Sequence, residues 1–348
     1  MRITAVTCVK NEGAFLLEWL AHHKGVGFTD FLVLSNDCDD GTDQMLDRLQ
    51  AMGELVHLRN DGPYDQAGVQ WTGFKTADKH PLVREADWLM TLDVDEFVNV
   101  QVGDHTLAAL MAALPEADAI TMTWRLFGNG GVVQYHDRPV TETFTRAAPP
   151  VMYWPWRAFM FKTLYRNNGA YNKLGVHRPR APVEGKVEQT QWFDGHGRAL
   201  EPRFRKGQIF SPFGRENYGL VQLNHYALGA MESYLLKRAR GRVNRSSEPM
   251  GMDYWTERNW AEMEETSIRA CDGLRDAHLD RLRGDAELAE LHENAVAWRH
   301  TQFEALMDDE SYRALMGRLM MTPPARALPI DAAKMLLKHA QKQHRPKD

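Results

Sequence analysis

Short apolar runs alternate with segments of helical periodicity through the first third of the chain. Runs bounded by Gly, Asn and Asp have the length and composition of buried strands at 3–9, 31–34, 55–58, 88–92 and 119–124. Apolar residues recur at helical spacing over 15–23, 45–49, 67–77 and 107–114. This alternation predicts an α/β fold with a mostly parallel, Rossmann-like sheet and helices on both faces. Ligands of such sheets bind beyond the carboxyl ends of the strands.

The pattern changes after about residue 126. Residues 127–213 are rich in Gly, Pro, Trp and Arg, and two short strands are expected there, at 159–164 and 187–193. From 231 to 321 apolar residues recur with a helical period, and 332–348 predicts a short basic amphipathic helix with a frayed end. We therefore divide the chain into segments 1–125, 126–230 and 231–348.

The composition is that of an ordinary globular protein, with 43% hydrophobic and 26% charged residues. No apolar run approaches the roughly 20 residues of a membrane span, and the N-terminus lacks the apolar segment of a signal peptide. The cysteines, Cys8, Cys38 and Cys271, are too scattered for a disulfide framework or a zinc ribbon. We expect a reducing, cytoplasmic compartment.

The distribution of charge says more than the net charge of −5. Residues 1–120 carry 8 basic and 20 acidic side chains, a net charge of −12, whereas residues 146–215 carry 13 basic and 4 acidic ones, a net charge of +9. A protein that binds nucleic acid over a broad face should be basic there and in total. The observed order instead suits a site that holds a cation with the first part and an anionic ligand with the second.

Two aspartates follow the apolar run 88–92. Asp93 and Asp95 are separated by one residue, so both can approach one ion if the chain bends as it leaves the strand. Hard divalent cations prefer oxygen ligands and take the remaining ones from water and substrate phosphates. A solvated Asp-rich turn would give the same pattern, but its position after a fourth parallel strand favours a metal site.

Polar residues also follow the first and second predicted strands. Asn11 and Glu12 come after the first, and Asn36, Asp37 and Asp39 come after the second. Such side chains can hydrogen-bond a nucleobase or a ribose, while Asp40 or Thr42 can cap the next helix. Because the carboxyl ends of parallel strands meet at one edge, three strand ends are expected to converge on one crevice.

Several segments resemble known sequence motifs. Residues 1–100 are similar to the nucleotide-sugar half of glycosyltransferase family 2, of the GT-A class, in ITAVTCVKNEGAFLLEWLAHH, VLSNDCDDGTDQML, DQAGVQWTGFKTA and ADWLMTLDVDEFV. Beyond residue 120 the chain resembles the related family 92 in WRLFGNGG, VTETFTRA, KLGVHRP and LNHYALGAMESYLLKRARGR. The resemblance extends to about residue 245.

This resemblance implies a GT-A fold and a hexosyltransferase-type enzyme that moves a sugar from a nucleotide diphosphate, expected to be UDP-linked, to an acceptor hydroxyl. Segment 1–125 would bind the nucleotide-sugar, 126–230 the acceptor, and 231–348 would be a helical extension. A Mn²⁺ or Mg²⁺ ion would bridge the diphosphate. The implied metal ligands are Asp93, which would also lie near the ribose, Asp95 and His225.

The resemblance also assigns the donor site. Asn11, Glu12, Asn36, Asp37 and Asp39 would contact uracil or ribose, and Gln70 stands in the third helix where the family usually has Arg-Asn. The basic residues after His225 would neutralise the diphosphate, although they could equally form a solvated helix face: Lys237, Arg238, Arg240 and Arg242.

An inverting transfer requires a general base against the acceptor hydroxyl. The leading candidates are Glu142 and Asp194, with Glu201 and Asp137 behind them, and each could instead be a surface carboxylate. His177 and Trp192 are assigned to the acceptor cleft, although either could belong to the core.

The expected partners are the nucleotide-sugar donor and a glycan or lipid-linked acceptor, without nucleic acid. The basic tail suggests at most peripheral contact with a membrane, and a solubilising terminus is the simpler interpretation.

Three other functions remain as alternatives. In a phosphatase of the haloacid dehalogenase type Asp93 would be the nucleophile, but that type carries its motif on the first strand and adds a Gly-Asp-Gly-x-x-Asp segment that is missing here. A non-catalytic sugar-nucleotide binder would not need the two aspartates. A nucleotidyltransferase would need a Gly-rich loop after the first strand.

Overall fold

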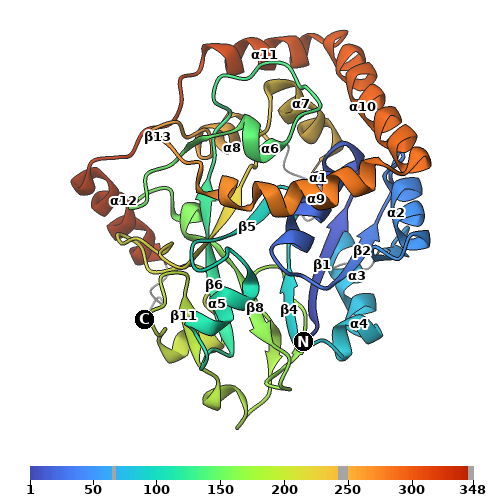
Figure 1. The fold of residues 1–348 in the computed structure, drawn as a ribbon. Helices are drawn as coiled ribbons and strands as arrows, with labels where there is room; N and C mark the ends of the chain where they lie inside the picture. The colour runs from blue at the N-terminus through green and yellow to red at the C-terminus, as the bar shows by residue number, and fades with distance from the viewer. Residues whose placement is uncertain (65–67, 242–249, 344–348) are drawn as a thin grey trace.

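The computed structural model describes residues 1–64, 68–241 and 250–343, with a mixed sheet at its centre (Figure 1). The strands are β1 (Ile3–Val9), β2 (Asp30–Ser35), β3 (Val56–Arg59), β4 (Trp88–Thr91), β5 (Glu96–Val100), β6 (Ala119–Leu126), β7 (Arg146–Ala147), β8 (Phe161–Arg166), β9 (Tyr171–Lys173), β10 (Arg180–Pro182), β11 (Trp192–Asp194), β12 (Val221–His225) and β13 (Met263–Glu264). Within the described residues the main sheet has nine strands in the order β3-β2-β1-β4-β8-β6-β12-β5, with β11 paired to β6.

The N-terminal half of this sheet is parallel. β1 pairs with β2 and β4, and β2 pairs with β3, all in parallel register. The connecting helices are α1 (Gly13–Gly25), α2 (Thr42–Ala51), α3 (Val69–Ala77), α4 (Pro81–Arg84) and α5 (Leu107–Ala113). They cover both faces, which is why these strands are continuous apolar runs rather than alternating ones. The predicted α/β fold is confirmed.

The second half of the sheet is mixed. β8 lies antiparallel between β4 and β6, and β12 lies parallel to β6 and antiparallel to β5. The strand predicted over 187–193 is wrong for most of its length, because Val187–Gln189 forms a 3₁₀ turn and only Trp192–Asp194 joins the sheet. Val187 and Trp192 are both buried, and a short apolar run does not reveal which backbone conformation buries it.

Helices dominate the C-terminal part of the chain, as predicted. After the short α6 (Val140–Thr143) come α7 (Met231–Arg240), α8 (Met252–Thr256), α9 (Asp272–Arg283), α10 (Ala286–Met307), α11 (Glu310–Met321) and α12 (Ile330–Gln343). α9 packs against α1, and α10 packs against α2 and α7. Leu279, Leu282 and Leu288 are buried in the same core as β1, so α9 and the start of α10 pack onto the sheet domain.

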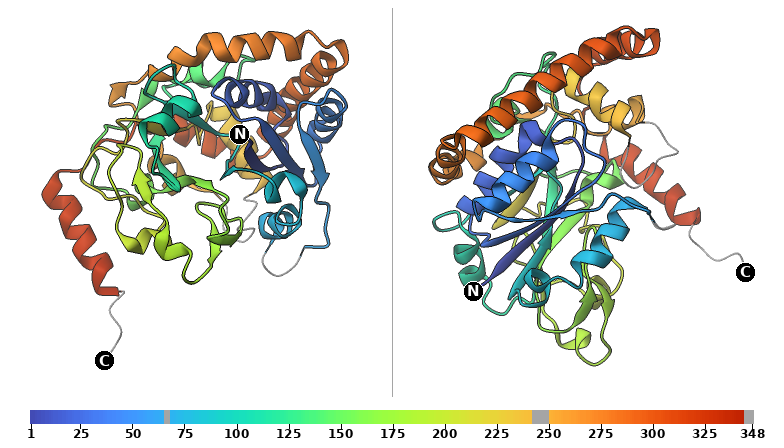
Figure 2. Two further views of the ribbon diagram at one scale, coloured as in Figure 1. Left: turned by 60° about the horizontal axis from the view of Figure 1, so that its bottom comes forward. Right: turned by 90° about the vertical axis from the view of Figure 1, so that its right-hand side faces the viewer.

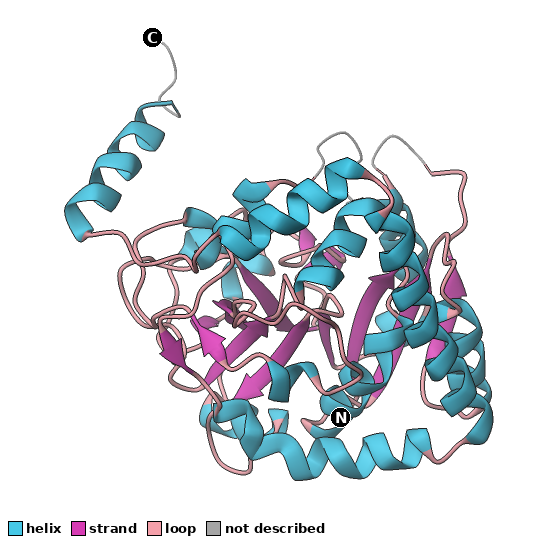
Figure 3. Ribbon diagram, turned by 90° about the horizontal axis from the view of Figure 1, so that it is seen from above, coloured by secondary structure: helices cyan, strands magenta, loops and turns pink. Residues whose placement is uncertain are grey.

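The end of the chain differs from the rest. α12 projects from the body of the molecule, which the views of Figures 2 and 3 both show. Among the helices of the described residues, none has the length and hydrophobicity needed to cross a bilayer.

The start of α1 is fixed by a close approach of α10. A Cβ atom on Gly13 would lie 2.8 Å from the Cβ of Ala295, so no larger residue fits there without a shift. Asp40 ties the same point to the next helix, since its carboxylate accepts hydrogen bonds from the backbone N–H groups of Gly13 (3.0 Å) and Thr42 (2.9 Å). The loops after β1 and β2 are therefore held together at the carboxyl edge of the sheet.

Candidate functional site

Asp95 lies where β4 gives way to β5, at the carboxyl edge of the parallel strands. β12 pairs with β5 so that His225 stands opposite Glu96, which places the His225 ring beside Asp95. His225 Nε2 lies 3.7 Å from Asp95 Oδ1, and the Lys237 ammonium donates to Asp95 Oδ2 at 2.6 Å. Burial opposes ionisation of Asp95, but Lys237 and His225 outweigh it and hold its pKa well below the usual range.

Asp93 has a different environment from Asp95. Lys162, buried on β8, donates to Asp93 Oδ2 at 2.9 Å and lies 3.3 Å from Glu96. Trp124 donates its indole N–H to the other oxygen of Glu96 at 2.7 Å. Burial raises the pKa of Glu96 to about 8, which Lys162 opposes. Each aspartate therefore has its own lysine.

The predicted metal trio is not assembled. Among the described residues, no group of three or more His, Cys, Asp and Glu side chains lies close enough to hold an ion. Asp93 is bonded to Lys162, and the assignment of Asp93, Asp95 and His225 as joint metal ligands stays a prediction. Asp95 and His225 remain together as a pair of potential ligands.

An aromatic contact links the two sides of this site. The Trp124 ring lies between two histidines, with centroids 4.2 Å from His225 and 5.6 Å from His177. Burial lowers the pKa of His177 to about 4 and also lowers the pKa of His225, so both imidazoles favour the neutral form. His177, assigned to the acceptor cleft from the sequence, lies near Asp93.

The loops after β1 and β2 hold most of the predicted donor-site residues. Asn11 adopts a left-handed backbone conformation (φ 52°), and its side-chain oxygen accepts the Asp39 N–H at 2.7 Å. Asp37 also has a positive φ, and its carboxylate accepts the Tyr64 hydroxyl at 2.7 Å. Asn36 donates to the same carboxylate at 3.3 Å. The structure therefore brings these residues together at one edge of the sheet, as their positions after the predicted strands indicated.

Helix α7 carries the predicted basic residues over this edge. Lys237 reaches Asp95, and Arg240 donates to the Lys10 carbonyl and to the Glu12 carboxylate. Arg238 instead donates to the carbonyl of Met250. Arg242 lies outside the described residues. Two of the four predicted cations thus line the crevice.

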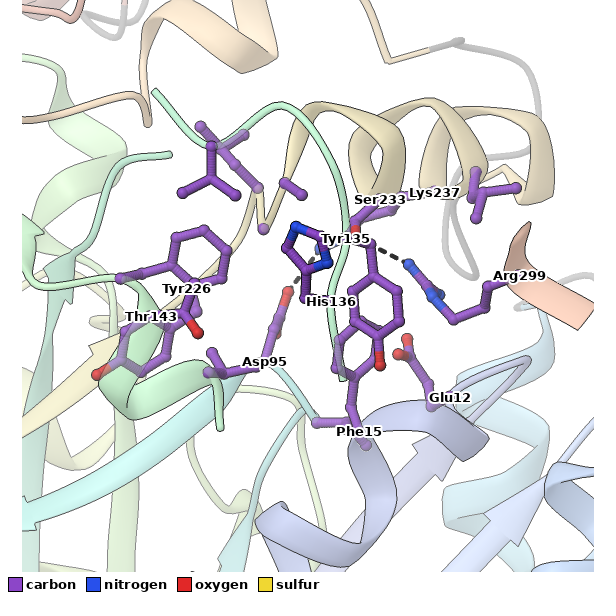
Figure 4. A pocket seen from close by; sticks show the side chains of 18 of the residues that line it. Glu12, Phe15, Asp95, Tyr135, His136, Thr143, Tyr226, Ser233, Lys237 and Arg299 are labelled. Carbon is purple, nitrogen blue, oxygen red and sulfur yellow. Dashed lines mark hydrogen bonds and ion pairs between the residues drawn. The ribbon is translucent and has the colours of Figure 1, made fainter. Parts of the chain in front are cut away.

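A cavity of about 260 Å³ opens beside Asp95 (Figure 4). Its walls come from the turn after β1, the loop before α6, one face of α7 and helix α10. Most of the lining is aromatic or aliphatic. The charged groups in it include Glu12, Asp95, Lys237, Arg240 and Arg299.

Two predicted residues lie outside the site. Asp194 is fully buried, where its carboxylate accepts from Arg198 Nε at 2.9 Å and from Arg215 at 3.2 Å, so it cannot meet an acceptor hydroxyl. Trp192 is buried in a separate apolar cluster and packs against Tyr171. Both predictions are corrected: Asp194 closes a turn and Trp192 fills the core.

Two other predictions find only partial support. Glu142 is half-exposed on α6 and bonds Arg275 at 2.6 Å, next to the cavity-lining Thr143 but not itself in the lining. Gln70 is buried on α3. Neither is placed against the aspartates.

Sequence reasoning missed the residues that complete the site. Lys162 gave no signal, because a lone lysine inside an apolar strand has no motif of its own. Tyr135, His136 and Arg299 come from a loop and from a helix far along the chain. Only the tertiary packing brings them to Asp95.

Known proteins similar to this chain point to one family. The family model described as glycosyltransferase family 92 matches residues 4–198, more than half of the chain. A family 92 protein of Ricinus communis is 28% identical over 156 residues, and one of Oryza sativa subsp. japonica is 23% identical over 154 residues. Each match covers 41% of this chain and 26% or 24% of the relative, so it spans about a quarter of these longer proteins.

Solved structures give weaker similarity. S. aureus TarS 1-349 in complex with UDP-GlcNAc is 13% identical with a TM-score of 0.34, covering 100% of this chain and 93% of that one. Glucosyl-3-phosphoglycerate synthase from Mycobacterium tuberculosis, in complex with Mn²⁺, UDP and glucosyl-3-phosphoglycerate, is 16% identical with a TM-score of 0.25 and covers 36% and 44%. Both TM-scores are low, and the assignment rests on the family match. The chain belongs to glycosyltransferase family 92.

Proposed function

We propose that this chain transfers a sugar from a UDP-sugar to an acceptor hydroxyl with the help of a divalent cation. The observation that carries the proposal is Asp95, a partly buried carboxylate that contacts both His225 and Lys237 at the ligand-binding edge of the sheet. In a family 92 chain this is where a donor diphosphate and its counter-ion are expected. The related phosphatase hypothesis has no support in the family match.

The donor set at Asp95 fits a cation that keeps several of its ligands from elsewhere. Asp95 Oδ1 and the neutral imidazole of His225 are 3.7 Å apart, and Mg²⁺ usually takes one or two protein carboxylates together with water and phosphate oxygens. When bound, Mg²⁺ or Mn²⁺ would act as a Lewis acid that stabilises the departing diphosphate.

The remaining roles fall to this chain's own side chains. Lys237 and Arg240 bring positive charge to the diphosphate, where charge-assisted hydrogen bonds are strongest. Asn11, Asp37 and Asp39 accept hydrogen bonds from the base and the ribose. The acceptor is a glycan or a lipid-linked glycan, and the reaction takes place in the cytoplasm.

The test is release of UDP from a panel of UDP-sugars, measured with Mn²⁺, with Mg²⁺ and with a chelator. We expect the chelator to abolish release, and Asp95→Ala to lower metal-dependent turnover by about 100-fold or more, because charge stabilisation of the leaving group is lost. The matched control is Glu304→Gln, an exposed carboxylate on α10.

Full metal-dependent turnover by Asp95→Ala would show that the cation binds elsewhere. Binding of the donor without any turnover, measured by calorimetry, would instead favour a sugar-nucleotide binder.

Contact with a membrane is a separate proposal that concerns α12. Its basic residues Lys334 and Lys338 lie on a helix that projects from the body, where each could contribute about 1 kcal/mol on an anionic surface. Unchanged co-sedimentation with anionic liposomes after deletion of 330–348 would rule this out.

A further inference from the structure

The cavity beside Asp95 has an apolar body and a distinct charge pattern. Phe15, Val94, Phe144 and Trp298 belong to its lining, and its volume of about 260 Å³ suits a small group rather than a whole glycan. Such pockets bind ligands through apolar contact and fix their orientation through a few polar groups. The polar groups therefore indicate which ligand it takes.

Most charged side chains of the cavity are already paired. Asp95 is bonded to Lys237 at 2.6 Å, and Glu12 is bonded to Arg240. These two pairs cancel, so they do not select the charge of a ligand. Arg138 also lines the cavity and forms no ion pair with a described residue, but it is exposed to solvent. Arg299 is therefore the buried exception.

Arg299 on α10 is a buried cation that lacks an anionic partner. Its side chain donates to the Ser233 hydroxyl at 2.9 Å, and its guanidinium lies 4.5 Å from the centre of the Phe15 ring and 4.8 Å from that of Tyr135. The residue is only 5% exposed, and its Nε has no hydrogen-bond partner. Among the described residues no carboxylate forms an ion pair with it, although Glu12 and Asp40 are near enough to oppose the lowering of its pKa by burial. Figure 4 shows it at the cavity wall, reaching toward Ser233.

A buried guanidinium without a counter-ion is costly unless a ligand compensates it. Arg178 provides a comparison inside the same molecule, since it too is buried and stacked on aromatic rings, 5.4 Å from Trp192. Arg178 donates from two of its nitrogens to backbone carbonyls, its third nitrogen has no hydrogen-bond partner, and it lines neither this cavity nor the second pocket, near Asp78. Arg299 differs because it faces a cavity of ligand size.

The cavity adjoins the expected donor site but does not include its base-binding loop. Asn36, Asp37 and Asp39, which form the expected base-binding loop, are not part of its lining. Its walls come instead from residues 132–144, 226–240 and 298–299, together with the turn after β1. Asn11, Glu12, Lys237 and Arg240 do belong to the lining, so a ligand in the cavity would lie next to the donor's ribose and diphosphate rather than beside its base.

We propose that this cavity binds the acceptor, and that the acceptor carries an anionic group, a carboxylate or a phosphate, which pairs with Arg299 while an apolar part packs against the aromatic lining. The assignment of this ligand as the sugar acceptor rests on the proposed function. The preference for an anion rests on Arg299 alone and can be tested without turnover.

The test uses three small aromatic probes that differ in charge: benzoate, phenyl phosphate and the neutral benzamide. Ligand-observed NMR titration gives their affinities for the full chain. We expect one or both anions to bind at least about tenfold more tightly than benzamide, because a hydrogen bond to a charged group is worth about that much. The comparison of the two anions distinguishes carboxylate from phosphate.

Variants then connect this preference to one side chain. Arg299→Gln should reduce the preference for the anions to about twofold or less, and Arg299→Lys, which keeps the charge, should retain part of it. Arg178→Gln is the matched control and should keep the full preference. Thermal unfolding of each variant identifies any that fails to fold. If Arg299→Gln does not fold, the titrations of Arg299→Lys and of the wild-type chain decide whether Arg299 binds the anion.

Several outcomes would overturn the proposal. These are equal binding of anions and benzamide, failure of every probe to bind at millimolar concentration, or an unchanged preference in Arg299→Gln. Displacement of the probes by saturating UDP would place the cavity in the donor site instead. A clear preference for anions in a chain that never turns over a UDP-sugar would preserve the anion site and contradict the proposed transferase.

Discussion

Two lysines, the buried Lys162 and the partly buried Lys237, neutralise the two aspartates of the Asp-x-Asp motif. Lys162 is 1% exposed and contacts both Asp93 and Glu96, while Lys237 contacts Asp95. Burial disfavours the charged form of Lys162, but Asp93 and Glu96 outweigh it and raise its pKa. Each lysine therefore stabilises negative charge that a hydrophobic strand would otherwise not tolerate.

Removing Lys162 should destabilise the fold more than its single charge suggests. Lys162→Met leaves Asp93 and Glu96 without their cationic partner, and we expect the free energy of unfolding to fall by about 3–5 kcal/mol. Urea denaturation measures it, with the exposed Lys173→Met as a control that should change stability by less than about 0.5 kcal/mol. A loss as small as in the control would mean that the buried carboxylates are compensated elsewhere.

Asp194 tests the distinction between a catalytic and a structural carboxylate. Asp194→Asn removes the charge that holds Arg198 and Arg215, and we expect a loss of about 2–4 kcal/mol in stability. Turnover per folded molecule should stay within about twofold, whereas loss of a general base costs about 100-fold or more. A folded variant with that larger loss would restore Asp194 as the base.

At the scale of elements, the site depends on how closely helices approach the sheet edge. α10 touches the start of α1 so tightly that Gly13 and Ala295 leave no room for another methyl group. This contact holds the turn after β1, which carries Asn11 and Glu12, against the helix that carries Arg299. The cavity thus depends on packing between distant parts of the sequence.

Gly13→Ala should therefore destabilise the protein by about 1–3 kcal/mol through overpacking. Ala295→Gly creates room but costs about 1 kcal/mol of helix propensity. In a double-mutant cycle by thermal or urea unfolding, the two changes should be less harmful together than the sum of the singles. If the two free-energy changes are simply additive, α10 can move away from the start of α1 without cost.

At the scale of the whole molecule, charged contacts tie the C-terminal helices to the N-terminal half. Glu54, before β3, lies 3.0 Å from Lys24 of α1 and accepts from Arg281 of α9 at 2.8 Å. The Arg281 hydrogen bonds lower the pKa of Glu54 to about 2, although burial opposes this.

The free energy of unfolding should consequently depend on pH in the acid range through Glu54. Because its folded pKa lies below the unfolded value of 4.5, the stabilisation is complete above pH 4.5 and is lost as the pH falls toward about 2. Since Arg281 is half exposed and solvent screens the pair, the contribution is about 1–2 kcal/mol. Denaturation at several pH values should show a shallower acid loss in Glu54→Gln, and parallel curves would argue against this tie.

The sequence predicted much of the N-terminal half because burial on both faces produces continuous apolar runs. β1 matches its predicted range, and β2, β3, β4 and β6 lie within two residues of theirs. The 3₁₀ turn at Val187–Gln189 was missed because burial without regular periodicity leaves backbone conformation undetermined. The sequence also did not show that residues from all three predicted segments share one core. That core arises from contacts between distant elements, such as those of α9 with α1.

Chain order alone determined that Asp93 and Asp95 follow a strand and that polar loops end its parallel neighbours, because local patterning encodes where strands stop. Only the folded structure decided which cation each carboxylate meets, how β12 registers against β5 to bring His225 to Asp95, and that Arg299 closes the cavity. Those choices depend on side chains 69 or more residues apart, and no local period records a contact over that distance.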